Sequence, residues 1–276
     1  MKLATILTIL FSVSAHSAEL ALENIEFHPY KIYKKYRVNN NKIKVSALII
    51  DGEAEPELGS FRVPVEQFNH SKDVSKYVVR TSATRGFGSA VLVGGNFLLT
   101  NLHVISKIKN PKTKCNSFKV HSPAFGFKNE KFKCKKVHYC SKPFDFCLVE
   151  MFDGTKGTKL SNQAKPQLNA FQTLSASERI TAVGNPSNYG LYASSGFGLE
   201  EFGPYRFKFY APVYHGNSGG GLFNDQAQLV GLVFGMSLGR RSTDDFNAAI
   251  RLSTIRQLLT QNLEKPEEIL SLMNWK

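Results

Sequence analysis

A serine placed among glycines is the feature that most constrains this chain. Ser218 lies in the run H-G-N-S-G-G-G, residues 215–221, and strand-like apolar sequence flanks this run on both sides. Glycines leave room for a carbonyl to approach the Ser218 hydroxyl, and they expose backbone N–H groups that can stabilise an oxyanion. The run therefore predicts a nucleophilic serine in a turn between strands. A glycine-rich turn without chemistry is the alternative.

His103 is the candidate base for this serine. A serine hydroxyl is a poor nucleophile at neutral pH and needs a base that accepts its proton. His103 follows the apolar segment 97–101 within T-N-L-H-V, residues 100–104, which would place the imidazole at a strand end on the rim of a barrel. An isolated histidine is more often a buried structural residue, but this pattern is more specific than an isolated histidine.

The candidate acid follows by elimination. Asp145 and Asp153 are the two aspartates between His103 and Ser218. Asp153 precedes a glycine, which is typical of a turn. Asp145 opens an apolar strand-like segment, residues 144–151, where a buried carboxylate would be costly without a partner such as the His103 N–H. Asp145 is therefore predicted to orient the imidazole.

Five segments of the chain resemble the chymotrypsin-like (trypsin-fold) serine peptidases, in particular the bacterial trypsin-like peptidases related to the Deg-type and glutamyl endopeptidases. The segments are G-S-A-V-L-V (88–93), T-N-L-H-V (100–104), D-F-C-L-V (145–149), G-N-S-G-G (216–220) and L-V-G-L-V-F-G (229–235). The likeness extends over about residues 75–262. The chain order His, Asp, Ser agrees with it, because subtilisins and α/β-hydrolases carry these groups in other orders.

This resemblance implies an all-β fold of two antiparallel six-stranded β-barrels with a C-terminal helix. The predicted segments are a signal peptide at 1–18, an N-terminal extension at 19–74, and a peptidase domain at 75–276 divided into a first barrel (75–160), a second barrel (161–252) and a C-terminal helix (253–276). The predicted strands are 77–82, 88–93, 97–101, 118–121, 133–139, 146–151, 180–184, 190–197, 205–214, 220–223, 228–234 and 246–252. Ser253 is expected to cap the helix, and Pro266 to start a second helical piece ending at Met273. The extension could be a propeptide, accessory strands or an inhibitory plug, and a strand is expected at 42–50.

The resemblance also implies a serine endopeptidase that forms an acyl-enzyme. Ser218 would attack the scissile carbonyl, His103 would take its proton, and Asp145 would stabilise the imidazolium. The backbone N–H groups of Gly216 and Ser218 would form the oxyanion hole. Protein or peptide substrates are implied, with no metal and no cofactor. A catalytically silent trypsin-fold protein that binds partners through a basic surface is the alternative function.

The substrate pocket is predicted to be apolar. Basic-specific relatives have an acid where this chain has Pro212, and glutamyl endopeptidases have a histidine where it has Val233. An uncharged apolar side chain is therefore expected before the cleaved bond. The residues assigned to this pocket are Pro212, His215, Val233, Phe234, Gly235 and Ala248. For His215, an exposed structural residue is an equal alternative to a place at the pocket rim.

The N-terminus resembles a secretory signal peptide. A lysine at position 2, an apolar run at 3–13 and small residues at 14–18 follow one another. The run is too short for a comfortable membrane span, which needs about 20 apolar residues. Cleavage after Ala15 or Ala18 and a secreted or periplasmic location are therefore predicted, with no integral span afterwards. An uncleaved anchor is the alternative.

The four cysteines lie close together in the sequence. They are Cys115, Cys134, Cys140 and Cys147. An even number in an exported chain favours disulfides, and the pairs 115–134 and 140–147 are preferred because each would join neighbouring strands around the acid. A zinc site and free buried thiols are the alternatives, although no C-x₂-C pair is present.

The positive charge is concentrated in one segment. Ten lysines against one acid, Glu130, lie between Lys107 and Lys136, in a chain of formal net charge +13. The segment predicts either a solvated loop or a surface that attracts anionic cell surfaces or acidic substrates. Nucleic acid is not favoured, because the interleaved aromatics also fit half-buried strands. These aromatics are Phe118, Phe125, Phe127 and Phe132.

Overall fold

The computed structural model describes most of the chain after residue 72 together with two N-terminal strands. The described residues are 33–39, 42–48, 70, 73–83, 86–105, 115, 118–121, 131–171, 173–175, 178–188, 191–201, 203–211, 213–237 and 246–275. The predicted signal peptide, Pro212 and most of the lysine-rich segment lie outside them. No helix among these residues is both long and apolar enough to cross a membrane.

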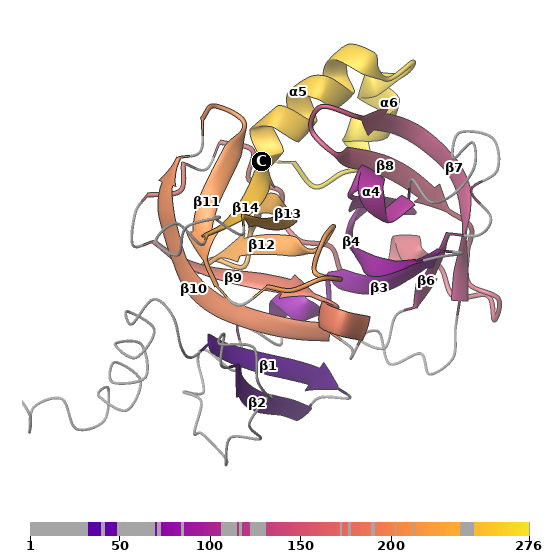
Figure 1. Ribbon diagram of the computed structural model, residues 1–276. Coiled ribbons are helices and arrows are strands. Elements are labelled where there is room, and N and C mark those ends of the chain that lie inside the picture. The colour runs from indigo at the N-terminus through magenta and orange to yellow at the C-terminus, as the bar shows by residue number, and fades with distance from the viewer. Residues whose placement is uncertain are drawn as a thin grey trace, which may run out of the picture.

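The first barrel is a closed sheet with the strand order β3-β4-β5-β8-β7-β6 (Figure 1). Its strands are β3 (Val78–Ala83), β4 (Gly86–Gly94), β5 (Phe97–Thr100), β6 (Lys119–His121), β7 (Lys131–Ser141) and β8 (Phe146–Met151). All neighbouring strands in it are antiparallel. This barrel carries both His103 and Asp145, as the sequence predicts.

The alternation of side chains along β7 explains its strand structure. Phe132 and Cys134 are buried, whereas Lys131 and Lys133 are exposed. A half-buried strand has this period of two, because successive side chains point to opposite faces. Phe118 is also fully buried, so these lysines and phenylalanines interleave as a pleated strand does. Two of the aromatics considered above lie outside the described residues, Phe125 and Phe127.

The second barrel contains six strands and is closed by the pairing of β10 with β11. Its strands are β9 (Arg179–Gly184), β10 (Leu191–Glu201), β11 (Arg206–Tyr210), β12 (Gly221–Asn224), β13 (Leu229–Ser237) and β14 (Phe246–Arg251). Two short 3₁₀ turns, Leu160–Asn162 and Pro186–Asn188, lie in the connections. The predicted fold of two antiparallel six-stranded barrels is therefore confirmed.

A hairpin from the N-terminal extension is added to the second barrel. It consists of β1 (Tyr33–Asn39) and β2 (Lys42–Leu48), and β1 pairs with β10 through Tyr36 and Ala193. The strand predicted at 42–50 is thus confirmed over residues 42–48, and residues 49–50 lie outside the described residues. Of the three roles considered for the extension, accessory strands agree with this pairing, while the boundaries of the extension stay a prediction.

The chain ends in two helices, α5 (Leu252–Asn262) and α6 (Pro266–Ser271). The predicted Ser253 cap is wrong, because α5 begins at Leu252 and its N-cap position is Arg251, which forms no side-chain capping bond. Leu252 is completely buried, and the Arg251 N–H is still bound to the Tyr205 carbonyl as part of the sheet. Packing therefore fixes the start of this helix where no cap does.

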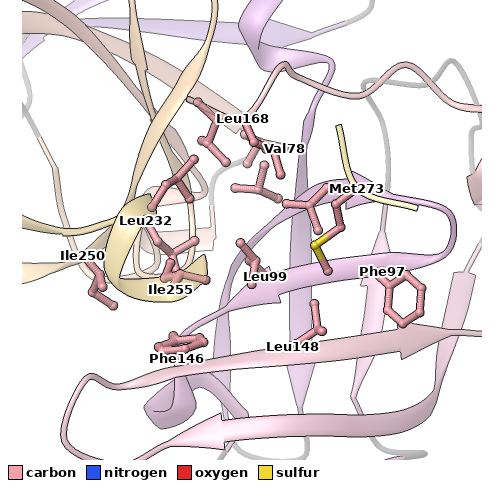
Figure 2. Close-up of a cluster of buried hydrophobic side chains, with 14 of the residues drawn as sticks. Val78, Phe97, Leu99, Phe146, Leu148, Leu168, Leu232, Ile250, Ile255 and Met273 are labelled. Atoms are coloured by element: carbon pink, nitrogen blue, oxygen red, sulfur yellow. The ribbon is translucent and has the colours of Figure 1, made fainter. Parts of the chain in front are cut away.

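One hydrophobic cluster joins the two barrels and both helices (Figure 2). Leu99 and Phe146 from the first barrel lie near Leu232 from the second and near Ile255 from α5, and all four are completely buried. Two further clusters fill the barrel interiors. The continuous core holds the barrels together, so residues at their junction can meet in a defined geometry.

The four cysteines form the two preferred disulfides, Cys115–Cys134 and Cys140–Cys147. The zinc and free-thiol alternatives are therefore wrong.

We expect the double variant C115A/C134A to lose about 2–4 kcal/mol in the free energy of unfolding, because this bridge restrains the unfolded chain. Denaturant titration under oxidising conditions measures the loss. Wild type in which this disulfide is reduced should have the same free energy of unfolding as the variant. A variant as stable as oxidised wild type would contradict the expectation.

Candidate active site

His103 and Asp145 form a pair at the open end of the first barrel. His103 lies on the one-turn helix α4 (Leu102–Ile105) directly after β5, and Asp145 is the last residue of the turn between β7 and β8. The His103 Nδ1 and the Asp145 Oδ2 are 2.5 Å apart, and the His103 backbone N–H donates to Asp145 Oδ1 over 2.8 Å. Both carboxylate oxygens therefore hold one residue, which fixes the orientation of its ring.

The pair combines an accessible base with a covered acid. The His103 side chain is 49% exposed, whereas that of Asp145 is 18% exposed. A proton held on Nδ1 by the carboxylate leaves the lone pair of the imidazole on Nε2, where it can accept a proton from another group. This arrangement suits an imidazole that works as a general base on a bound molecule.

The backbone of Asp145 is held in an unusual conformation. Its φ is 53°, in the left-handed region that costs a non-glycine residue about 1 kcal/mol or more. Its carbonyl accepts hydrogen bonds from the Leu102 N–H (3.2 Å) and from Asn101 Nδ2 (2.8 Å). The Cys140–Cys147 disulfide closes the hairpin whose turn ends at Asp145. Asp145 is thus fixed through its carbonyl, its carboxylate and the base of its hairpin.

The structure brings Asp145, and not Asp153, to His103. Asp153 accepts a hydrogen bond from Asn96 Nδ2 at 3.0 Å, at the opposite end of β8. The elimination made from the sequence therefore chose the aspartate that contacts the imidazole.

Ser218 lies in the loop between β11 and β12, against the first barrel. The Ser89 N–H donates to the Ser218 carbonyl over 2.9 Å. A Cβ at Gly88 would lie 2.8 Å from both methyl groups of Val104 and 3.3 Å from the Ser218 carbonyl oxygen. Glycine at position 88 therefore lets the helix that carries His103 and the loop that carries Ser218 approach the same point on β4.

The glycines around Ser218 are required by close contacts. Gly216 has φ +101°, and a Cβ there would lie 2.2 Å from the Asn185 carbonyl oxygen. Gly219 has φ +83°, and a Cβ there would lie 2.2 Å from the Ser89 carbonyl oxygen. At both positions φ is positive and an added Cβ would clash with a backbone carbonyl oxygen. A residue other than glycine would therefore have to displace the backbone there.

The backbone N–H groups in this loop alternate between bound and unbound. Asn217 donates to the Tyr214 carbonyl over 2.9 Å and Gly219 to the Val233 carbonyl over 2.8 Å. Among the described residues, no acceptor is bonded to the N–H groups of Gly216 and Ser218. An oxyanion next to Ser218 could accept hydrogen bonds from these two N–H groups.

Ser89 organises the loop, and the sequence patterns did not single it out as a site residue. Its hydroxyl donates to the Gly216 carbonyl (2.7 Å) and accepts from the Asn185 N–H (2.8 Å). The Ser89 carbonyl in turn accepts from Thr100 Oγ1 (2.7 Å). Its place as the second residue of G-S-A-V-L-V was the available signal, although short strand sequences contain serine for many reasons.

Four of the six residues assigned to a substrate pocket lie on the adjacent strands β13 and β14. Val233 on β13 and Ala248 on β14 are buried, and Ala248 is paired with Gly235. Phe234 is partly buried, and the Arg206 guanidinium lies 4.5 Å from the centre of its ring. His215 is exposed, and Pro212 lies outside the described residues. Within the described part of the chain, no group of three or more side chains suits a metal ion.

The family model of the trypsin-like peptidase domain matches residues 88–232, which is more than half of the chain. Exfoliative toxin A of Staphylococcus aureus is 26% identical over 233 residues, which cover 78% of this chain and 75% of the toxin.

Two solved structures share the fold. The serine endoprotease from Yersinia pestis has a TM-score of 0.56 and 19% identity, covering 74% of this chain and 67% of that one. The inactive form of an alanine mutant of Rv3671c from M. tuberculosis has a TM-score of 0.56 and 15% identity, covering 74% and 95%. At these identities the structures support the fold, while the family model supports the assignment itself. The chain therefore belongs to the trypsin-like peptidase family.

Proposed function

We propose that this protein is a secreted or periplasmic serine endopeptidase that uses Ser218, His103 and Asp145 as a catalytic triad. The observation that carries the proposal is the double hydrogen bond between Asp145 and His103, because it orients the imidazole and keeps its Nδ1 proton in place. His103 would take the proton of the Ser218 hydroxyl as it attacks the scissile carbonyl. It would then protonate the leaving amine, and water would hydrolyse the acyl-enzyme.

The N–H groups of Gly216 and Ser218 would stabilise the oxyanion of the tetrahedral intermediate. Their lack of an acceptor among the described residues supports this role, since a donor used by the fold would be unavailable to substrate. Such a donor typically contributes about 2.7–4 kcal/mol to transition-state stabilisation. Ser89 would position the hole through its bond to the Gly216 carbonyl.

The substrates would be proteins outside the cytoplasm. The N-terminal sequence supports export, and two disulfides agree with an oxidising compartment. The buried, uncharged Val233 and Ala248 support a pocket for an uncharged apolar side chain, with Pro212, Phe234, Gly235 and His215 around it.

Labelling with a fluorophosphonate probe tests the proposed nucleophile. The probe reacts with an activated serine, so wild type should be labelled and Ser218→Ala should not. Ser161→Ala is the matched control, because Ser161 is exposed and lies far along the chain from the loop. Equal labelling of wild type and Ser218→Ala would refute the triad. A folded wild type that takes no label would instead support the silent binding protein.

We expect Gly216→Ala to lower kcat by about 10²–10³-fold, which is the effect of losing one oxyanion donor. The added Cβ would meet the Asn185 carbonyl and turn the Gly216 N–H away. Kinetics with a chromogenic peptide measure the effect. Gly203→Ala is the control, because Gly203 also has a positive φ (+69°) but nothing within 4 Å of an added Cβ. A similar loss in both variants would indicate backbone strain in place of a lost donor.

A further inference from the structure

The outer face of the first barrel carries a group of basic side chains on three adjacent strands. Lys119 on β6 lies directly opposite Lys133 on β7. A second row on the same face contains Arg80 on β3 and Lys131 on β7, which both pair with the same residue of β6. We call these four residues the basic face. The side chains between the two rows point inward, and all are buried, namely Thr81, Val120 and Phe132.

The lysines of this face are not neutralised within the described part of the protein. None of Lys119, Lys131 and Lys133 forms an ion pair with a described carboxylate. Like charges directly opposite one another on neighbouring strands repel and destabilise the sheet. The fold therefore bears an unfavourable Lys119–Lys133 pair that a bound anion would relieve.

The next lysine along β7, Lys135, is neutralised by a carboxylate. Lys135 Nζ donates to Glu150 Oε1 over 2.6 Å, and His138 Nε2 lies 2.8 Å from Glu150 Oε2. Burial raises the pKa of Glu150, but the hydrogen bonds from Lys135 and His138 outweigh burial and leave that pKa below its ordinary value. Glu150 thus stays ionised and pairs with Lys135, whereas no described carboxylate pairs with Lys119, Lys131 or Lys133.

The lysine-rich segment extends in the sequence beyond the strands of this face. The Cys115–Cys134 disulfide brings residue 115 to within 5.5 Å (Cα to Cα) of residue 134, the neighbour of Lys133. Lys114 directly precedes Cys115, and Glu130 is the one acid in the sequence between Lys107 and Lys136. The sequence on either side of the strands that form the face is therefore rich in lysine.

The basic face lies away from the proposed catalytic centre. In the closed order β3-β4-β5-β8-β7-β6, β6 is across the barrel from β5 and β3 is across from β8. His103 follows β5 and Asp145 precedes β8. A partner on the basic face would leave the His103–Asp145 pair open to substrate.

We propose that the basic face binds a linear polysaccharide that carries sulfate or carboxylate groups, and that this holds the enzyme at an anionic matrix while it cleaves. Lys131 and Lys133 are exposed and lie about 6.6–6.8 Å apart along β7, and the partly exposed Lys119 lies about 5 Å from Lys133 across the strands, so the three form a ladder of point charges for a polymer with repeated anionic groups. Phe118 and Phe132 are fully buried and cannot stack on nucleobases. None of the exposed large hydrophobic side chains among the described residues lies on β3, β6 or β7, so the face lacks a group that inserts into lipid.

Heparin, a sulfated polysaccharide, is the probe that tests this proposal. We expect wild type to bind immobilised heparin at physiological salt and K119E/K133E to bind at least tenfold more weakly. The control K76E/K265E changes the net charge equally at two exposed lysines outside the face and should change the affinity less than twofold. The milder variant K119Q/K133Q should weaken binding and lower the slope of log affinity against log salt by about two, since each lost contact releases fewer counterions. Turnover of a short peptide should be unchanged in all variants.

Three outcomes would overturn the proposal. Equal weakening by K119E/K133E and K76E/K265E would assign binding to diffuse net charge. Unchanged heparin affinity in K119Q/K133Q and K119E/K133E, both folded by thermal unfolding, would exclude the face. Tighter binding of single-stranded DNA or of phosphatidylglycerol vesicles than of heparin, lost in K119E/K133E, would replace the polysaccharide with that partner.

Discussion

Ser218→Ala is expected to lower kcat on a peptide substrate by about 10⁶-fold, the loss found when the nucleophile of such a triad is removed. Without the hydroxyl, no acyl-enzyme can form, and the pair His103–Asp145 has no proton to accept. The substitution removes one oxygen from a partly buried side chain whose backbone contacts, such as the bond from Ser89 to the Ser218 carbonyl, do not involve the side chain. The thermal unfolding midpoint should therefore stay close to that of wild type.

Steady-state turnover of a chromogenic peptide at equal concentrations of folded protein measures this loss. Ser161→Ala should turn over like wild type. A folded Ser218→Ala that keeps more than a tenth of wild-type kcat would show that another residue is the nucleophile. Weak residual activity is expected, because substrate binding and the oxyanion hole accelerate the reaction without the triad.

Asp145→Asn is expected to lower kcat by about 10⁴-fold. The carboxylate accepts from both the His103 N–H and Nδ1. An asparagine has one acceptor oxygen, so its NH₂ group would face one of these two positions. If it faces the ring, Nδ1 must become the acceptor and the proton moves to Nε2, which can then no longer take the proton of Ser218.

Asp153→Asn is the matched control for this substitution, because Asp153 accepts its hydrogen bond from Asn96 and not from the imidazole. The control should keep wild-type kcat within about twofold. The double variant S218A/D145N should be no slower than Ser218→Ala, since residues that act as one unit are not additive. A loss below about a hundredfold in Asp145→Asn would mean that Asp145 has a structural role alone.

The strands were predictable where the local pattern of apolar and turn residues decides the structure. β8 begins at Phe146 and ends at Met151, as predicted, because its apolar run is bounded by turn residues. β10 was predicted to end at Phe197, but it continues to Glu201 across an irregularity in its pairing with β11. The extension depends on the partner strand, which the local pattern does not contain.

The segment that leads to Ser218 was predicted less well. A strand was expected from residue 205 to 214, but β11 ends at Tyr210. The chain leaves the sheet there, and the Tyr214 carbonyl accepts from the Asn217 N–H in the turn that presents Ser218. The residues 211–214 have a strand-like composition, and the requirement of the loop overrides it.

The sequence alone determined which groups have the required chemistry, because a serine among glycines, a histidine after an apolar strand and an aspartate opening another are properties of short segments. Tertiary structure alone decided how these groups are held. The bond between His103 and Asp145 joins residues 42 positions apart, and that from Ser89 to Gly216 joins residues 127 apart. The Lys119–Lys133 opposition likewise exists through strand register alone, because contacts of this kind arise only when distant segments pair.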